Sequence, residues 1–371
     1  MKKIGLIIEA FLLLAVVTIM SAQPANPIPF ESQASPLSID MQWFLFYQNG
    51  ERDEQAFNEF ALKRGYVNIK KTINPTFSGR ITTDITVDRE GDGEGDVEMR
   101  LKYLYLKTAL PEFEWLNDPH IEVGLVHRPW LDFEQHINRY RVQGTMFLER
   151  IGVINSGDFG MVLLANIGGE VDEEYQKTVN SSFAGKYGSM AFGIFNGGGY
   201  HALEKNANKT VEGRLTLRPL PEKLPGLQVT GHGAVGKGNT AAAPDWRYGS
   251  AYLSYENPAV IVTGEFYRGL GNYKGTALKD ALTVKALPQS GYSLFGEWKE
   301  LMDGRISIIV RYDHVTRQYT ISDRSTNRMI TGLAYHFIRG SKIVLDYDVI
   351  RYDESGRADD HVLEAAIELK Y

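Results

Sequence analysis

The chain ends in the ten residues VLEAAIELKY, which run from Val362 to Tyr371. Every second position from Leu363 to Tyr371 is apolar, and charged residues hold three of the four positions between them. A period of two predicts a β-strand with one apolar face and one polar face. This strand runs to the last residue of the chain and ends on an aromatic side chain.

The same alternation recurs along the whole chain. Two examples upstream are residues 343–349 and residues 306–313. About sixteen such segments leave roughly 22 residues for each strand and its connection, which suits transmembrane strands of about 10 residues. The segments start near Met41, Glu59, Phe77, Val97, His120, Asp158, Lys186, Val211, Leu227, Tyr248, Ala259, Tyr292, Arg305, Arg328, Lys342 and Val362.

The connections between these segments alternate in length. Counted back from the C-terminus, the connections 339–341, 301–304 and 256–258 are short, and those between them are long: 353–361, 316–327, 269–291 and 237–246. Short turns at one end and long loops at the other are typical of outer-membrane barrels. We therefore predict an all-β fold, a transmembrane antiparallel β-barrel of about 16 strands with a long third outer loop. Two turns, 108–119 and 169–185, exceed this pattern and leave the count open by two in the N-terminal half.

The N-terminus carries the layout of an export signal. Lys2 and Lys3 precede an apolar run over residues 4–20, and the small residues Ser21 and Ala22 follow. This predicts a secretory signal peptide cleaved after Ala22, with an uncleaved membrane anchor as the alternative. The predicted organisation is a signal peptide over 1–22, an extended segment over 23–39 and a transmembrane β-barrel over 40–371.

Composition excludes several classes of protein. The 371 residues include no cysteine, so disulfides, thiolate metal sites, cysteine nucleophiles and lipidated cysteines are absent. The formal net charge of −6 argues against a nucleic-acid partner. A secreted soluble β protein is a competing interpretation, but sixteen strands would then form two sandwiches with a linker, and no linker is visible in the sequence.

Several short motifs resemble the landmarks of the phosphate-selective porin (O and P type) family. They are Gly124-Leu-Val-His-Arg-Pro129, the later Arg150, Asp158-Phe-Gly160, and Phe195-Asn196-Gly197, and the resemblance spans roughly residues 58–371. It implies a sixteen-stranded homotrimer whose third outer loop folds into the lumen. The family's arginine ladder has no residue-by-residue match here. The terminal strand also resembles the signature by which such proteins are handed to the barrel assembly machinery, which makes Tyr371 the candidate assembly signal.

The longest connection, from His127 to about Gly157, is the candidate pore constriction. A long loop in a compact fold is usually functional or disordered, and its aromatic residues favour an ordered loop folded inward. A solvated surface loop is the alternative. Four arginines face three acids in it, which predicts a weak preference for anions: Arg128, Arg139, Arg141 and Arg150 against Asp132, Glu134 and Glu149.

Alternation also assigns basic residues to the pore wall. The candidates are Arg100, Lys102, Arg214, Arg218, Lys299, Arg305 and Arg311. Acidic residues share the lumen face, so the preference for anions should be modest: Glu212, Glu265, Glu297, Asp346 and Asp348.

Two glycine-rich stretches match ligand-binding motifs in part. The acidic run Asp88, Glu90, Asp92, Glu94 and Asp96 has the spacing of a calcium loop, but Met99 stands where the bidentate glutamate belongs. It is a weak candidate for a divalent ion, and a solvated acidic loop is the alternative. The stretch from Gly231 to Gly236 fits a dinucleotide fingerprint, but no helix is expected after it.

The sequence as a whole predicts a bacterial outer-membrane porin for passive diffusion of small hydrophilic solutes, anionic or neutral, with a weak phosphate-like anion preference. No enzyme and no cofactor are expected; its partners would be outer-membrane lipid, the assembly machinery and two further copies. The alternatives are an outer-membrane barrel enzyme, which would assemble its residues from distant strands, and a closed structural or adhesive barrel. Sixteen strands argue against the closed barrel, because that width normally leaves an aqueous channel.

Overall fold

The computed structural model describes residues 37–88, 93–338 and 340–371. Sixteen antiparallel strands close into one barrel, as the alternation predicts, and each strand pairs with its neighbours in the chain. Their bounds are β1 (Leu37–Arg52), β2 (Gln55–Thr72), β3 (Phe77–Val87), β4 (Val97–Ala109), β5 (Leu116–His127), β6 (Gly157–Ile167), β7 (Gly188–Phe195), β8 (Thr210–Leu217), β9 (Leu227–Lys237), β10 (Asp245–Glu256), β11 (Val260–Leu270), β14 (Pro288–Leu301), β15 (Ile306–Gln318), β16 (Asp323–Ile338), β17 (Ser341–Tyr352) and β18 (Asp360–Lys370).

The barrel closes where the first strand meets the last. β1 and β18 pair from Gln42 opposite Lys370 to Glu51 opposite His361. The backbones of Met41 and Tyr371 continue the ladder with two hydrogen bonds of 2.8 and 3.2 Å. Closure leaves no strand edge unpaired, which is the condition for a sheet in lipid.

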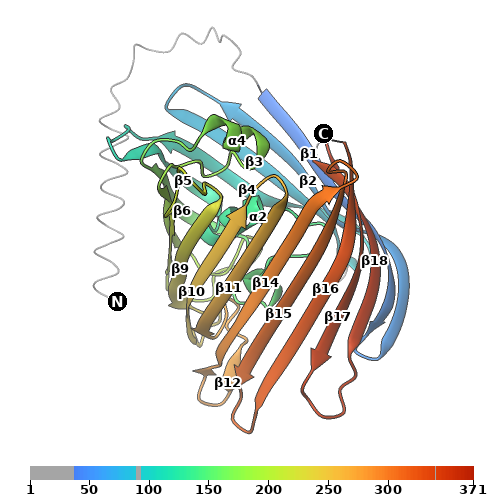
Figure 1. Cartoon of the computed structure of the whole chain (residues 1–371). Helices are drawn as coiled ribbons and strands as arrows, with labels where there is room; N and C mark the ends of the chain where they lie inside the picture. Colours follow the sequence, from blue (N-terminus) through green and yellow to red (C-terminus); the bar gives the residue numbers. More distant parts are fainter. Residues whose placement is uncertain (1–36, 89–92, 339) are drawn as a thin grey trace.

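The remaining elements lie in the connections. The third outer connection, residues 128–156, contains α2 (Pro129–Ile137) and α3 (Phe147–Arg150). The turn after β6 contains α4 (Glu173–Thr178), at the end of the barrel where the C-terminus lies, and the small sheet of β12 (Leu278–Asp280) and β13 (Lys285–Ala286) lies at the other end (Figure 1).

Several boundaries differ from the sequence prediction. The connection predicted as a long loop over 316–327 spans only residues 319–322, because β15 and β16 stay paired out to Gln318 opposite Asp323. β1 begins at Leu37, three residues before the predicted start of the barrel. The long turns of the N-terminal half do not change the number of strands, because one spans only residues 110–115 and the other contains α4. The predicted signal peptide and residues 23–36 lie outside the described residues.

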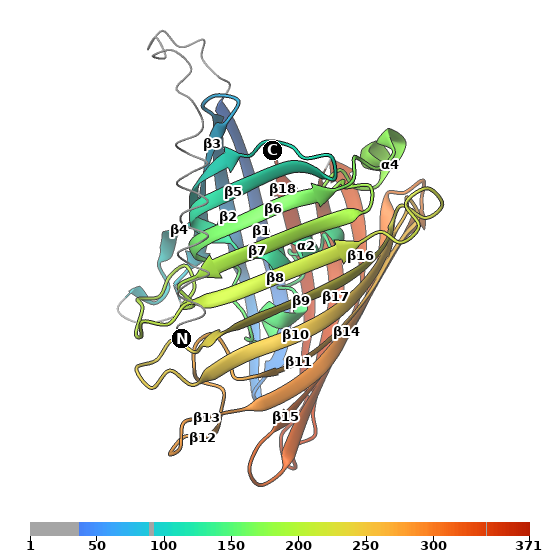
Figure 2. The same cartoon turned by 90° about the vertical axis from the view of Figure 1, so that its left-hand side faces the viewer.

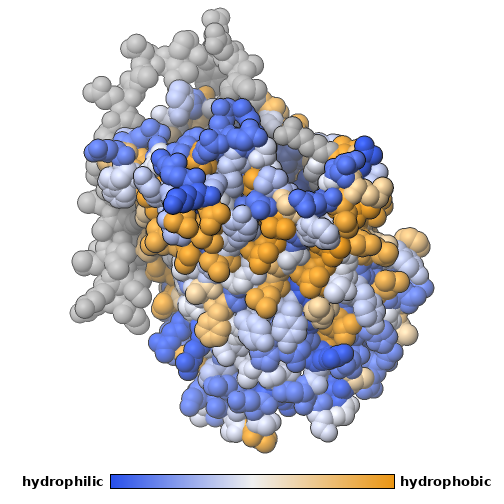
Figure 3. Space-filling view, viewed as in Figure 1, coloured by the Kyte–Doolittle hydropathy of each residue, from blue (hydrophilic) through white to orange (hydrophobic). Residues whose placement is uncertain are grey.

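The outer surface carries a belt of apolar side chains between two polar rims (Figure 3). On β14, the exposed rings of Tyr292 and Trp298 point outward six residues apart, which is about 20 Å along a strand. Such aromatic girdles flank the apolar band of barrels that span a membrane. Among the described residues, no helix is long and apolar enough to cross a membrane.

Candidate permeation pathway

The third outer connection lies inside the barrel and not on its surface (Figure 2). We call residues 128–156 the inner loop. Its helix α2 starts at a proline, which has no N–H to lose at that position, and buries Trp130 and Phe133 completely. The indole of Trp130 stacks on the ring of His232 from β9 at 3.7 Å, and Phe147 packs edge-on against Tyr267 of β11.

An ion-pair cluster holds the start of the inner loop. Arg128 is 1% exposed and pairs with Glu212 at 2.9 Å and with Asp158 at 3.3 Å. Its guanidinium also lies 4.6 Å from the centre of the Phe195 ring. A buried charge is tolerated only with such partners, so Arg128 anchors the loop to β6–β8.

The tip of the inner loop crosses the lumen and touches the far wall. Tyr140 donates to Glu297 of β14 at 2.6 Å. From the opposite side, Lys63 of β2 donates to the carbonyls of Val142 and Gln143 at 2.9 Å, and Lys342 of β17 donates to the Arg139 carbonyl at 2.7 Å.

The turn that contains α4 supports the inner loop from the other end of the barrel. Arg139 donates to the Val179 carbonyl at 2.7 Å and pairs with Glu256 of β10 at 3.2 Å. Asn180 donates to the His136 carbonyl at 3.1 Å. The unusual length of this turn therefore has a structural role, because it packs beneath the loop.

The inner loop leaves two cavities between itself and the walls formed by β1–β4 and β16–β18. The outer cavity, of about 380 Å³, extends along β1 from Phe44 to Arg52. The inner cavity, of about 560 Å³, is lined by Asp40 and Gln42 of β1 and lies nearer the C-terminal end of the barrel. Arg141 lines both cavities, so its side chain marks the waist between them.

Both cavities have more basic than acidic side chains. Six basic residues face three acidic ones in the outer cavity: Arg52, Lys63, Arg64, Arg141, Arg150 and Arg328 against Asp346, Asp348 and Glu364. Seven face three in the inner cavity: Lys70, Arg80, Lys102, Arg139, Arg141, Lys177 and Lys370 against Asp40, Asp132 and Glu368. The lining is thus positive although the chain as a whole carries −6.

Two β-bulges direct basic side chains to the waist. The β1–β2 register shifts between Phe44 and Leu45, and the extra residue on β2 is Lys63. The β3–β4 register shifts between Thr82 and Thr83, and the extra residue on β4 is Lys102. A bulge sets consecutive side chains on the same face, which is how neighbouring inward residues arise in an alternating strand.

Carboxylates partner the bases at the waist. Arg141 pairs with Glu149 of α3, Arg64 with Asp84, and Lys63 with Glu364. Burial opposes ionisation of Glu149, but the adjacent Arg141 outweighs it and holds the pKa of Glu149 below its usual value. The basic side chains are therefore oriented by partners rather than free.

A third cavity, of about 360 Å³, adjoins the inner one and is less basic. It is lined by Asp118, Glu122 and Asp132 with three histidines, and Lys107 is its one lysine or arginine. His127 and Glu122 are 2.9 Å apart. This side cavity offsets part of the positive lining. The described residues include no group of three His, Asp or Glu side chains placed to hold a metal ion.

The four predicted constriction arginines have different positions. Arg141 and Arg150 line the outer cavity, and Arg139 lines the inner one. Arg150 is held by the Thr145 carbonyl at 2.8 Å and pairs with Asp313 at 3.5 Å. Arg128 lines neither cavity, because it is buried at the anchor of the loop, which corrects its assignment to the constriction.

Among the predicted wall residues, only Lys102 lines one of the two main cavities. Arg305 was placed on the wall, but it is exposed in the turn before β15, since the strand begins one residue later. The others are held by protein partners: Arg100 by Asp84 and Glu98, Arg214 by the Ser189 side chain, Arg218 by the Gly185 carbonyl, Lys299 by the Asn257 carbonyl and Arg311 by Asp313.

Sequence reasoning missed eight of the basic residues that line the two cavities: Lys63, Arg64, Arg80, Arg328, Arg52, Lys70, Lys177 and Lys370. The first two are adjacent in the middle of β2, and this pair of consecutive charges was the available signal for the bulge. Lys70 and Lys71 near the end of the strand are also adjacent and have no bulge. In the acidic loop, Glu90 and Asp92 lie outside the described residues. The backbone N–H of Asp88 donates there to the carbonyl of Asp96 at 2.7 Å.

The fold is that of outer-membrane porins. The barrel superposes on an anion-selective porin from Comamonas acidovorans with a TM-score of 0.61 at 8% identity, covering 91% of this chain and 100% of that one. It superposes on OmpF of Salmonella typhi, in complex with daunomycin, with a TM-score of 0.61 at 12% identity, covering 91% of this chain and 98% of that one. It superposes on a loop-deletion mutant of OmpT, an outer membrane protein of Vibrio cholerae, with a TM-score of 0.59 at 12% identity, covering 91% of this chain and 100% of that one. No family model matches the chain, and no curated protein matches it.

Proposed function

We propose that this chain is a channel of the bacterial outer membrane through which small hydrophilic solutes diffuse passively, with a modest preference for anions. The route runs through the outer cavity, past Arg141, and into the inner cavity. The observation that carries the proposal is the excess of basic side chains along both cavities, thirteen basic positions against six acidic ones with Arg141 counted in each.

Local charge outweighs the net charge of the chain in such a passage. Fields from exposed carboxylates are screened within about 8 Å in physiological salt. An ion in a narrow lumen is instead attracted or repelled by the side chains that line it, as in other channels whose selectivity comes from charged rings. The carboxylate partners at the waist keep the expected preference modest.

Two finer features belong to the same proposal. Phosphate-like anions would be among the solutes, which the sequence resemblance and the guanidiniums of Arg64 and Arg141 support, since guanidinium groups suit tetrahedral oxyanions. The barrel would assemble as a homotrimer after export by its signal peptide. Light scattering of the detergent-solubilised protein should then give three copies, and a monomer would contradict the trimer alone.

The decisive measurement is the reversal potential of single channels in a planar bilayer under a salt gradient. Wild type should show an anion-selective potential, and Arg141→Gln should move it toward zero. Arg139→Ala with Arg141→Ala should move it further, although Arg139 also supports the loop. Arg305→Gln is the matched control, because it removes the same charge from an exposed turn outside both cavities.

The outcomes separate clearly. A cation-selective wild type would overturn the anion preference. If Arg141→Gln and Arg305→Gln gave the same conductance and reversal potential, the waist would lie elsewhere. We further propose that the chain is not an enzyme. A purified barrel that conducts ions but does not hydrolyse ester or peptide substrates supports this proposal. Hydrolysis of such a substrate by the purified barrel would refute it.

A further inference from the structure

A separate cavity of about 390 Å³ lies on the outer face of the barrel, across β9, β10, β11 and β14. Its lining includes Val235, Arg247, Gly249 and Arg268, which point away from the lumen by alternation. Tyr248, between Arg247 and Gly249 on β10, also lines the cavity, but its side chain is buried toward the lumen. This cavity therefore has no part in the permeation pathway.

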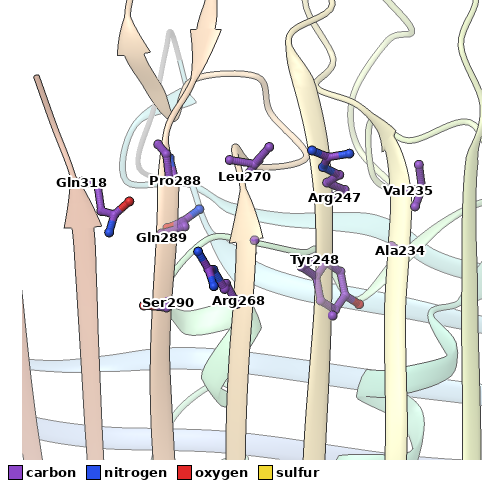
Figure 4. Close-up of a pocket in the computed structure, with 12 residues that line it drawn as sticks. Ala234, Val235, Arg247, Tyr248, Arg268, Leu270, Pro288, Gln289, Ser290 and Gln318 are labelled. Carbon is purple, nitrogen blue, oxygen red and sulfur yellow. The ribbon is translucent and has the colours of Figure 1, made fainter.

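Two guanidiniums project from neighbouring strands into this cavity (Figure 4). Arg247 lies opposite Leu270, and Arg268 lies opposite Gly249, so the two arginines are diagonal neighbours on one face. Neither forms an ion pair within 4.0 Å with a carboxylate of the described residues, although Arg247 attracts Asp245 at longer range. Asp245, the acid on the same face of β10, is held by Lys237 at 2.6 Å.

The aromatic girdle shows where the cavity lies along the membrane normal. Phe266 precedes Arg268 by two residues on β11, and Tyr292 follows the lining residue Ser290 by two on β14. Both rings point outward and are exposed. The arginines therefore lie one step beyond the apolar belt, at the end opposite the chain terminus, where lipid headgroups meet water.

Beside the arginines the wall is bare of side chains. Gly213, Gly233 and Gly249 lie in register across β8, β9 and β10. A Cβ atom added at Gly213 or at Gly249 would meet no atom within 4 Å. Packing within the barrel does not demand glycine at these two positions, so the space is open to a molecule outside it.

We propose that this cavity binds the phosphorylated headgroup of a lipid in the outer leaflet, with Arg247 and Arg268 on the phosphate and the apolar chains along the belt beneath. The proposal rests on the membrane location proposed above. Guanidinium–phosphate contacts are strong because they are charge-assisted and directional. A lipid is favoured over a free anion because the cavity opens onto the apolar belt, where acyl chains add contact.

The test is a titration of the folded, detergent-solubilised barrel with lipid A that carries a phosphate on each sugar, followed by native mass spectrometry. Wild type should bind one such lipid more tightly than the dephosphorylated form. Arg247→Gln with Arg268→Gln should weaken binding at least about tenfold, since two charge-assisted contacts are lost. Arg324→Gln with Arg351→Gln is the control, because these exposed arginines lie on β16 and β17 outside the cavity.

Equal binding by the two double variants would overturn the proposal, and so would equal affinity for the phosphorylated and dephosphorylated lipids. Displacement of the lipid by millimolar sodium phosphate would identify a free-anion site and overturn the lipid assignment. Pairing of two barrels through this face, in place of lipid adducts, would also overturn it. A barrel that folds and conducts as proposed but fails this test refutes only the lipid site, whereas a chain that is monodisperse without detergent refutes the membrane location itself.

Discussion

The lumen has two unlike halves. On one side, the walls formed by β7–β11, β14 and β15 are covered by the inner loop, and their charges are locked against it. Arg214 there lies 4.5 Å from the centre of the Phe133 ring and donates to Ser189. On the other side, β1–β4 and β16–β18 face the two cavities.

The comparison shows that facing inward does not make a residue part of the pathway. Inward arginines occur in both halves, and their fate depends on which wall the inner loop covers. We call the two halves the packed wall and the open wall. Changes on the packed wall should alter stability, and changes on the open wall should alter conduction.

The largest effect is expected at Trp130, where the inner loop packs against the packed wall. Trp130→Ala removes a fully buried indole stacked on His232, and should lower the free energy of unfolding by about 3–5 kcal/mol. Urea unfolding from lipid vesicles measures this change. Trp115→Ala is the control, because Trp115 is exposed in the turn 110–115. Equal stability of the two variants would show that the loop is not anchored there.

The next effect is expected at the closing seam between β1 and β18, which lies within the open wall. Tyr371 continues the β18 ladder with Met41, and its hydroxyl accepts a hydrogen bond of 2.9 Å from the Trp43 indole. Deleting Tyr371, or changing it to lysine, should lower the amount of protein in the outer membrane while export continues. Trp43→Phe separates the side-chain bond from an assembly signal, since it should leave the level almost unchanged. Fractionation that finds Tyr371→Lys at wild-type levels would contradict the prediction.

A smaller effect is expected at Lys63, where the open wall touches the loop tip. Lys63→Met removes two bonds to loop carbonyls and leaves Glu364 without this partner, at a cost of about 1–3 kcal/mol. The loop tip should become more mobile, so the noise of the single-channel current should rise clearly while the free energy of unfolding falls only by this amount. Lys71→Met, at the exposed end of the same strand and outside the lining of both cavities, is the control. Quiet channels in the Lys63 variant would show that the tip is held by other contacts.

The smallest effect is expected from acid. The pKa of Glu149 lies below its usual value, so its contribution to stability is complete above the unfolded-state pKa and is lost only as pH falls through the depressed value. Protonation there removes one negative charge beside Arg141 and should strengthen the anion preference. Glu149→Gln should show that stronger preference at neutral pH and a weaker response to acid. An unchanged reversal potential in this variant at pH 7 would argue against Glu149 as a neighbour of the pathway.

The sequence by itself determined the barrel. A period of two repeated in sixteen segments requires strands with one apolar and one polar face, and alternating connection lengths indicate their up-and-down order. Both patterns can be read from the sequence because they depend only on residues close together in the chain. The strand starts deduced near Phe77, Val97 and Leu227 coincide with the observed ones. The long third connection and its aromatic content also identified the inner loop from local composition.

Only the tertiary structure decided which charges line a pathway. Lys63 and Arg64 both face the lumen because a bulge resets the alternation, and a bulge depends on the register with β1. Arg128 was predicted at the constriction, but Asp158 and Glu212, distant in sequence, bury it. Arg305 matched the alternation but lies in the turn, one residue before β15 begins. The side of the sheet that a residue faces follows from local periodicity. Its partners, and the wall that is covered, follow from where the inner loop, residues 128–156, folds across the lumen.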